Sequence, residues 1–313
     1  MSKKEVKKQH YVPQFYLNYF ADNNKNIYVY DKATLKQFTS NSKGVASQQF
    51  FYDLFDNDNQ FIEKNHNRIY ENAFSSFMPQ FFKEIEKHKY FSLKRYHKEE
   101  IASFVAYQYI RTKKFREESY RLNTGVHIYA PVDSKLLEDL HPTLVHRFLL
   151  VDYHLHNTLF NKLLNEYVWI IGRNTSNQLF YTSDHPLAQT KTIQQLHDEQ
   201  RIKKGSSFTL LSEQIAFPIA PKYIILFFKK NKFKRFNRKK NRILNLDNEE
   251  IKRLNYMQVM GCYRQVYSQN NDFSFAEEIE ELLRQAQIAS GKDPNTILVP
   301  PQKKEIKNKE EGL

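Results

Sequence analysis

The chain has 313 residues and a formal net charge of +13. Its single cysteine, Cys262, excludes an intramolecular disulfide or a metal cage of several thiolates, and this favours a reducing compartment. No apolar run approaches the roughly 20 residues of a membrane helix, and polar residues from Gln9 stand where a signal peptide needs an apolar segment. We therefore expect a cytoplasmic protein without a membrane partner.

The positive charge predicts attraction to polyanions, although the lysine and asparagine content is also typical of an AT-rich, bacterial genome. No repeat and no linker rich in glycine, serine or proline divides the chain. We expect a basic N-terminal tail over 1–8, a single α+β domain over 9–295, and a charged, disordered tail over 296–313.

Hydrophobic periodicity predicts helices in the first half and near the end, and strands mostly in the second half. Pro79 should kink or break the first long helix. The expected helices are 62–87, 98–121, 142–166, 248–260 and 274–289. The expected strands are 26–31, 167–172, 178–182, 214–218 and 223–228, with 167–172 and 178–182 forming a hairpin. This pattern predicts an α+β fold whose helical first half packs on a small, mostly antiparallel sheet from the second half.

A histidine precedes a proline-fixed turn and an aromatic cluster in the octapeptide HYVPQFYL, which runs from His10 to Leu17. Its imidazole suits general acid or base chemistry at neutral pH. The alternative is a buried histidine that caps the aromatic core. The octapeptide alone leaves both interpretations open.

This octapeptide resembles the hallmark of a bacterial family, domain of unknown function 4238. Other landmarks follow in the family's order over about residues 9–270, and they include the turn from Thr182 to Pro186. Further landmarks are Asp31–Lys32, Phe51–Leu54, Glu63, Glu71, Gln108–Thr112, Trp169, Phe217–Pro221, Asn255 and Arg264–Ser268. The resemblance implies that these motifs belong together, and it implies no reaction.

The turn from Thr182 to Pro186 places Ser183 and Asp184 directly after a predicted strand. A strand end braced by proline is a common way to hold a functional carboxylate. Serine and aspartate also cap turns without any further role. Both interpretations remain.

Gln108 and Arg111 are three residues apart on a predicted helix and therefore share a face. Together they could bind a phosphate or a carboxylate, with the guanidinium binding in bidentate fashion. Arg111 could equally pair with Glu63 or Glu71, which also share a helix face. The second arrangement would be a structural ion pair between helices.

The candidate catalytic residues are His10, Glu71, Gln108, Arg111 and Asp184. They supply an acid or base, carboxylates and a cation, which suits cleavage of a phosphodiester without metal. The same residues would also suit a polar network that orders the core. No nucleotide-cradling or metalloprotease motif occurs, and we expect neither a cofactor nor a metal site.

The densest positive charge lies between residues 229 and 242 and is interleaved with two phenylalanines. Cations neutralise phosphates and aromatic rings stack on unpaired bases, so this segment is a candidate contact for RNA or single-stranded DNA. The alternative is a solvated loop. The residues are Lys229, Lys230, Lys232, Phe233, Lys234, Arg235, Phe236, Arg238, Lys239, Lys240 and Arg242.

We interpret the sequence as that of a nucleic-acid-directed protein, in its most concrete form a metal-independent ribonuclease-like effector of a defence or toxin system. The alternative is a non-catalytic regulatory protein that binds nucleic acid, or a protein encoded near it in the genome. In that case the candidate catalytic residues form a structural network. The oligomeric state is left open.

Overall fold

The structure is a computed structural model that describes residues 5–54, 60–87, 90–122, 141–202 and 210–290. The predicted C-terminal tail, 296–313, and the first four residues of the predicted N-terminal tail lie outside the described residues. Within the described ranges no helix is both long enough and apolar enough to cross a membrane.

Helices dominate the first half of the chain and the region after residue 247. Three of the helical segments are short 3₁₀ or π turns, labelled η. The helical segments are α1 (Gln14–Leu17), η1 (Asn18–Phe20), η2 (Ile62–His66), α2 (Asn67–Lys87), α3 (Arg95–Ile110), α4 (Lys113–Leu122), α7 (Pro142–Val151), α8 (Tyr153–Glu166), α9 (Ile193–Ile202), η3 (Lys234–Lys239), α10 (Asn248–Gly261) and α11 (Ser274–Ala289).

The strands form sheets of two, five and four strands in the described chain. Their orders are β1-β4, β10-β5-β9-β8-β7 and β3-β2-β11-β6, and all pairs are antiparallel except β10 with β5. The bounds are β1 (Lys8–His10), β2 (Ile27–Asp31), β3 (Lys36–Ser40), β4 (Ser47–Gln49), β5 (Tyr167–Asn174), β6 (Thr182–Ser183), β7 (Ala188–Gln189), β8 (Gln214–Ala220), β9 (Tyr223–Lys229), β10 (Ile243–Leu246) and β11 (Gln265–Ser268).

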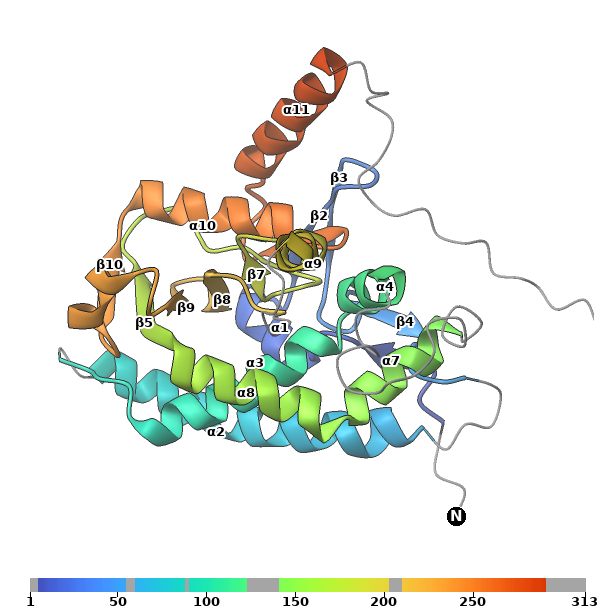
Figure 1. Cartoon of the computed structure of the whole chain (residues 1–313). Coiled ribbons are helices and arrows are strands. Elements are labelled where there is room, and N and C mark those ends of the chain that lie inside the picture. The colour runs from blue at the N-terminus through green and yellow to red at the C-terminus, as the bar shows by residue number, and fades with distance from the viewer. Residues whose placement is uncertain (1–4, 55–59, 88–89, 123–140, 203–209, 291–313) are drawn as a thin grey trace, which may run out of the picture.

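The five-stranded sheet lies between two helical layers, with α2, α3 and α8 on one side and α10 on the other (Figure 1). Side chains alternate along β5, so Trp169 and Ile171 join the core shared with the first-half helices. Val168 and Ile170 point the other way and join Ile251 of α10. Apolar burial on both faces holds this sheet in place, and the expected α+β class is confirmed.

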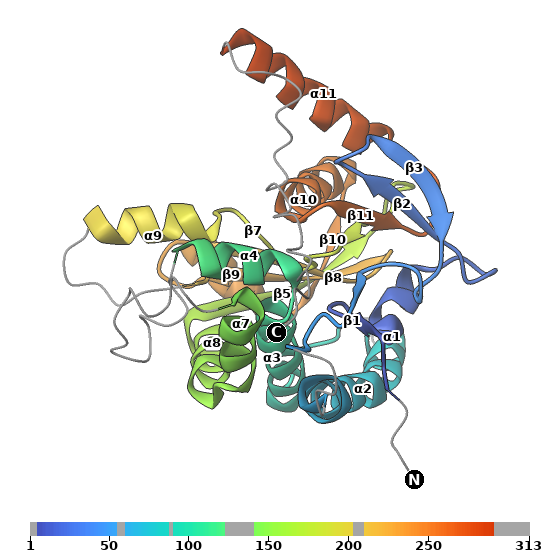
Figure 2. The ribbon, with the colours of Figure 1, turned by 90° about the vertical axis from the view of Figure 1, so that its right-hand side faces the viewer.

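The four-stranded sheet joins distant parts of the chain, because β2 pairs with β11 near the C-terminal end of the described residues. Its core includes Tyr30 and Val266 together with Ala276 and Ile279 of α11. Beyond these contacts α11 projects from the body (Figure 2). The sheets therefore use strands from both halves, whereas the sequence predicted one small sheet from the second half.

Two of the predicted helices are in fact pairs of helices. The predicted helix 98–121 is interrupted at Arg111 and Thr112, between α3 and α4. The predicted helix 142–166 breaks at Asp152, whose carboxylate accepts the backbone N–H of His154 and caps α8. Pro79, by contrast, lies inside α2 and does not end it.

The predicted hairpin between 167–172 and 178–182 is wrong. Strand β5 pairs with β9 and β10, and the short strand β6 pairs with β11 in a different sheet. The turn from Thr175 to Gln178 therefore carries the chain from one sheet to the other. It links the sheet that carries the core to the sheet that holds the Asp184 turn.

The close packing around Gly172 provides a test of this core. A Cβ atom at Gly172 would clash with Cδ1 of Leu246 and would lie 2.7 Å from Cγ2 of Ile224. We expect Gly172→Ala to lower the free energy of unfolding by about 1–3 kcal/mol, measured by urea denaturation. Leu246→Ala should recover part of that loss. Gly261→Ala is the control, because its nearest neighbour would lie at 3.3 Å, and an equal loss there would contradict the packing argument.

Candidate functional site

A buried arginine, Arg111, joins three separate segments of the chain at the end of α3. Its Nη1 donates to Oε1 of Glu71 at 2.8 Å, and its Nη2 donates to the His10 carbonyl at 2.6 Å. Its Nε donates to the Tyr52 hydroxyl at 3.3 Å. The side chain is 1 % exposed, so the guanidinium has exchanged water for these acceptors.

Helix packing explains this placement. Helices α2 and α3 pack together, and α3 ends where Arg111 can reach across to Glu71 on α2. Burial alone would lower the pKa of Arg111, but Tyr52 and Glu71 more than offset it, so the pKa lies above its ordinary value. The charge is therefore permanent and neutralised inside the protein.

The ring of His10 is also buried and makes few contacts. Its Nδ1 lies 3.4 Å from the amide nitrogen of Gln14, and its Nε2 has no hydrogen-bond partner among the described residues. Burial, together with Lys8 and Arg111, lowers the pKa of His10 to about 4. At neutral pH the imidazole is uncharged, and its backbone carbonyl, not its ring, is what Arg111 binds.

Glu63 is the residue of this region with a pKa near neutrality. Burial raises the pKa of its carboxyl to about 7, although Arg111 and the Asn67 amide act in the opposite direction. Asn67 donates to Oε2 of Glu63 at 2.8 Å and accepts the Tyr107 hydroxyl at 2.7 Å. The sequence suggested Glu63 only as an ion-pair partner of Arg111. Its raised pKa depends on the burial of its side chain within η2, which periodicity does not reveal.

Gln108 binds the backbone of the octapeptide. Its amide nitrogen donates to the Tyr11 carbonyl at 2.9 Å, while its Oε1 is buried without a partner in the described chain. The predicted residues His10, Glu71, Gln108 and Arg111 therefore meet around one stretch of backbone, His10–Tyr11. Three of the four are largely buried, and only Glu71 reaches solvent substantially.

Asp184 belongs to a different network. Its two carboxylate oxygens accept the backbone N–H groups of Tyr263, Arg264 and Gln265 at 2.8–2.9 Å. Burial raises the pKa of Asp184 to about 6, against the lowering effect of those hydrogen bonds. No hydrogen bond within the described residues joins it to the other four. The carboxylate therefore secures the backbone at the start of β11, about 80 residues away, and not its own turn.

The basic segment crosses from β9 to β10 and contains η3. Its two aromatic rings face the protein: Phe236 stacks on Phe228 with ring centroids 4.1 Å apart, and Phe233 lies 5.2 Å from the same ring. Most of its cations are exposed. The phenylalanines thus anchor the segment to the sheet and leave the cations toward solvent.

Cations from α3 extend this basic segment. The backbone N–H of Leu93 donates to the Asn241 carbonyl at 2.7 Å, which ties the start of α3 to the end of the segment. Burial lowers the pKa of Lys98, and Lys230, Lys240 and Arg95 lower it further. The members of this basic surface are Lys98, Lys230, Lys234, Arg235, Arg238, Lys239, Lys240 and Arg242.

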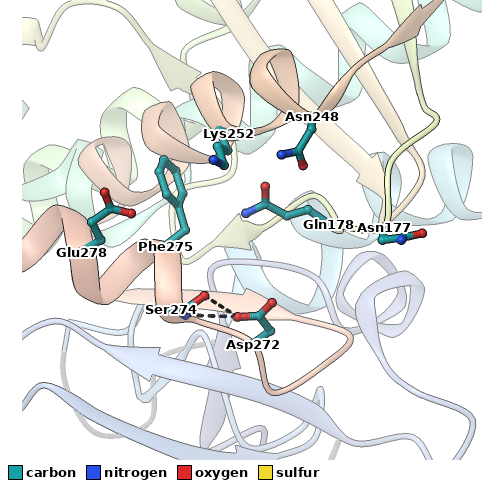
Figure 3. A pocket seen from close by; sticks show the side chains of 8 residues that line it. All are labelled: Asn177, Gln178, Asn248, Lys252, Asp272, Ser274, Phe275 and Glu278. Atoms are coloured by element: carbon teal, nitrogen blue, oxygen red, sulfur yellow. Dashed lines mark hydrogen bonds between the residues drawn. The ribbon is translucent and has the colours of Figure 1, made fainter.

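Neither of the two cavities described is lined by a predicted site residue. One, of about 450 Å³, lies between the loop at Asn177 and the starts of α10 and α11 (Figure 3). There the Asp272 carboxylate accepts both the N–H and the hydroxyl of Ser274. The other cavity, of about 500 Å³, lies among α4, α9 and α10 and is lined in part by His185.

A family model described as protein of unknown function (DUF4238) matches residues 8–272. The chain belongs to this family. The resemblance drawn from the octapeptide and the later motifs is thereby confirmed. No curated protein and no solved structure matched the chain. The role of this DUF4238 protein must therefore be argued from its own geometry.

The Arg111 network gives a first test of whether this site is structural. Arg111→Met leaves the His10 carbonyl and the Tyr52 hydroxyl without their buried donor, and we expect a loss of about 3–5 kcal/mol in the free energy of unfolding. Glu71→Gln keeps an oxygen that can accept from Nη1, at a position that is 30 % exposed, so we expect a smaller loss than for Arg111→Met. Urea denaturation of both variants measures the difference. Equal losses would mean that the ion pair with Glu71, and not all three hydrogen bonds of Arg111, holds the segments together.

Glu63 predicts an unusual pH dependence. Because its folded pKa is raised from 4.5 to about 7, the folded state holds a proton that the unfolded state releases, so this residue's contribution to stability falls as pH rises through that window. Glu63→Gln should gain stability over the wild type between pH 5 and pH 8, on the order of 1 kcal/mol because Glu63 is partly exposed. Chemical denaturation at both pH values measures it. Glu86→Gln, at an exposed position on α2, is the control for removing a charge.

Proposed function

We propose that this DUF4238 protein binds single-stranded RNA or DNA through the basic surface. The observation that carries the proposal is the gathering of like charges from two distant segments, where Lys230 and Lys240 lie close enough to Lys98 to lower its pKa. Like charges repel, so such a cluster favours an anion that neutralises it.

Missing counter-charges support the proposal. Lys234, Arg238, Lys239 and Lys240 have no ion-pair partner among the described residues, whereas Lys229 and Lys232 at the edge pair with glutamates at 3.6 Å. Regularly spaced phosphates would supply the missing negative charge and release counterions on binding. The two phenylalanines pack on the sheet, so binding would depend on phosphates more than on base stacking.

A metal-independent ribonuclease-like activity is the second candidate, and Glu63 is the residue that favours it. A carboxyl with a pKa near 7 beside a buried guanidinium could transfer a proton at neutral pH. Substrate would have to reach the partly exposed Glu63 and Glu71, because His10 and Arg111 are buried.

The test measures how oligouridine affinity depends on salt. For the wild type, the logarithm of the association constant should fall steeply with the logarithm of salt concentration. Combined Lys98→Gln, Lys230→Gln and Lys240→Gln substitutions should reduce that slope by about 2, or about 0.7 for each lost phosphate contact. Fluorescence anisotropy over a salt series provides the measurement.

Lys7→Gln, Lys36→Gln and Lys43→Gln together form the matched control, because they remove the same charge from exposed positions outside the basic surface. An equal change in the control would leave only net charge as the cause and would contradict the proposed surface. The same samples are run on a denaturing gel. Cleavage that disappears in Glu63→Gln while binding persists would favour the ribonuclease-like activity.

A further inference from the structure

The cavity beside α10 has the composition of a ligand site and shares no residue with the basic surface. Its volume of about 500 Å³ falls in the range of small-molecule pockets. It is enclosed by α4, the turn after Asp184, the loop leading into α9, and one side of α10. Its lining residues include Tyr109, Lys114, Glu118, His185, Leu187, Gln189, Lys191, Arg253, Tyr256, Met257 and Met260.

His185 is one of the residues that line this cavity. The side chain is 5 % exposed, and its Nδ1 lies 2.7 Å from the Thr112 hydroxyl. The hydroxyl also lies 3.2 Å from the Tyr109 carbonyl, and when it donates to that carbonyl it accepts from His185, whose Nδ1 then carries the hydrogen. We assign this tautomer to His185. Nε2 is then an acceptor, and it has no partner among the described residues although it is not sealed from solvent.

The lining of the cavity also contains positively charged side chains. Arg253 donates to the Gln214 amide oxygen at 3.3 Å and pairs with no carboxylate of the described chain. Lys114 is held by the Gly261 carbonyl at 2.8 Å and is 3.8 Å from Glu118. Lys191 is paired with Glu199 at 2.8 Å. Arg253 is therefore the cation most available to a bound anion.

Apolar and aromatic side chains also line the cavity. Met257 and Leu187 are buried, and Tyr109 places its ring 5.5 Å from that of His185. Tyr256 and Met260 are partly exposed on the same side of α10. Thioethers and aromatic faces adapt readily to a planar ring.

We propose that this cavity binds a nucleoside monophosphate, or a closely similar ligand with an aromatic heterocycle and one phosphate. The heterocycle lies against the methionine and tyrosine side chains and donates an N–H to Nε2 of His185. The phosphate meets Arg253, with Lys114 adding positive charge. A neutral nucleoside or inorganic phosphate alone satisfies only one half of the site.

Calorimetric titration of the full chain tests the proposal with adenosine monophosphate, uridine monophosphate, adenosine and inorganic phosphate as probes. At least one monophosphate should bind. Adenosine and inorganic phosphate should each bind at least about tenfold more weakly than that monophosphate. Arg253→Gln should weaken the monophosphate by about tenfold or more. Lys252→Gln, the neighbouring position on α10 and outside this cavity, is the matched control.

Chemical modification tests His185 without a substitution in the core. Diethyl pyrocarbonate acylates accessible neutral imidazole, so His185 should react in the free protein and be protected by the bound monophosphate. His146 is the internal control, because both of its nitrogens are engaged, by Arg116 and by the Ile110 carbonyl.

The proposal is overturned if no monophosphate binds at millimolar concentration, or if Arg253→Gln matches Lys252→Gln. Unprotected His185 in the presence of bound ligand would overturn it equally. The triple variant of the basic surface should bind as the wild type does, which separates this proposal from nucleic-acid binding.

Discussion

Much of this structure depends on the three hydrogen bonds that the buried Arg111 guanidinium donates. It holds the octapeptide backbone, the segment after β4 and helix α2 to the end of α3. A buried guanidinium is costly unless every acceptor is in place, so the position of each segment constrains the others.

Many of the helices could be predicted because apolar residues recur at helical spacing in the sequence. The breaks at Arg111 and Asp152 could not, because the periodicity continues across them and neither glycine nor proline marks the first. The failed hairpin has another cause. Local alternation identifies a strand but not its partner, and β5 finds its partners more than 50 residues away in β9 and β10.

The candidate site could be predicted in part. Helical spacing brought Gln108 and Arg111 to one face, and the structure places both beside the His10–Tyr11 backbone. Asp184 lies elsewhere, since its carboxylate binds the backbone before β11. Neither the raised pKa of Glu63 nor the Nε2 of the buried His185, which has no partner among the described residues, leaves a sequence signal. Both arise from burial among residues that are distant in the chain.

The cations of this molecule fall into two groups. Some are buried and paired within the fold, and others are exposed without a carboxylate partner in the described chain. Arg111 is buried and paired with Glu71, so its charge is compensated within the fold. Most cations of the basic surface, and Arg253 at the cavity, are exposed and lack carboxylate partners in the described chain. Exposed charges without internal partners contribute little to folding and remain available to an external anion. Recognition in this DUF4238 protein is therefore better sought at these unneutralised positions than in the buried polar residues of its most conspicuous motif.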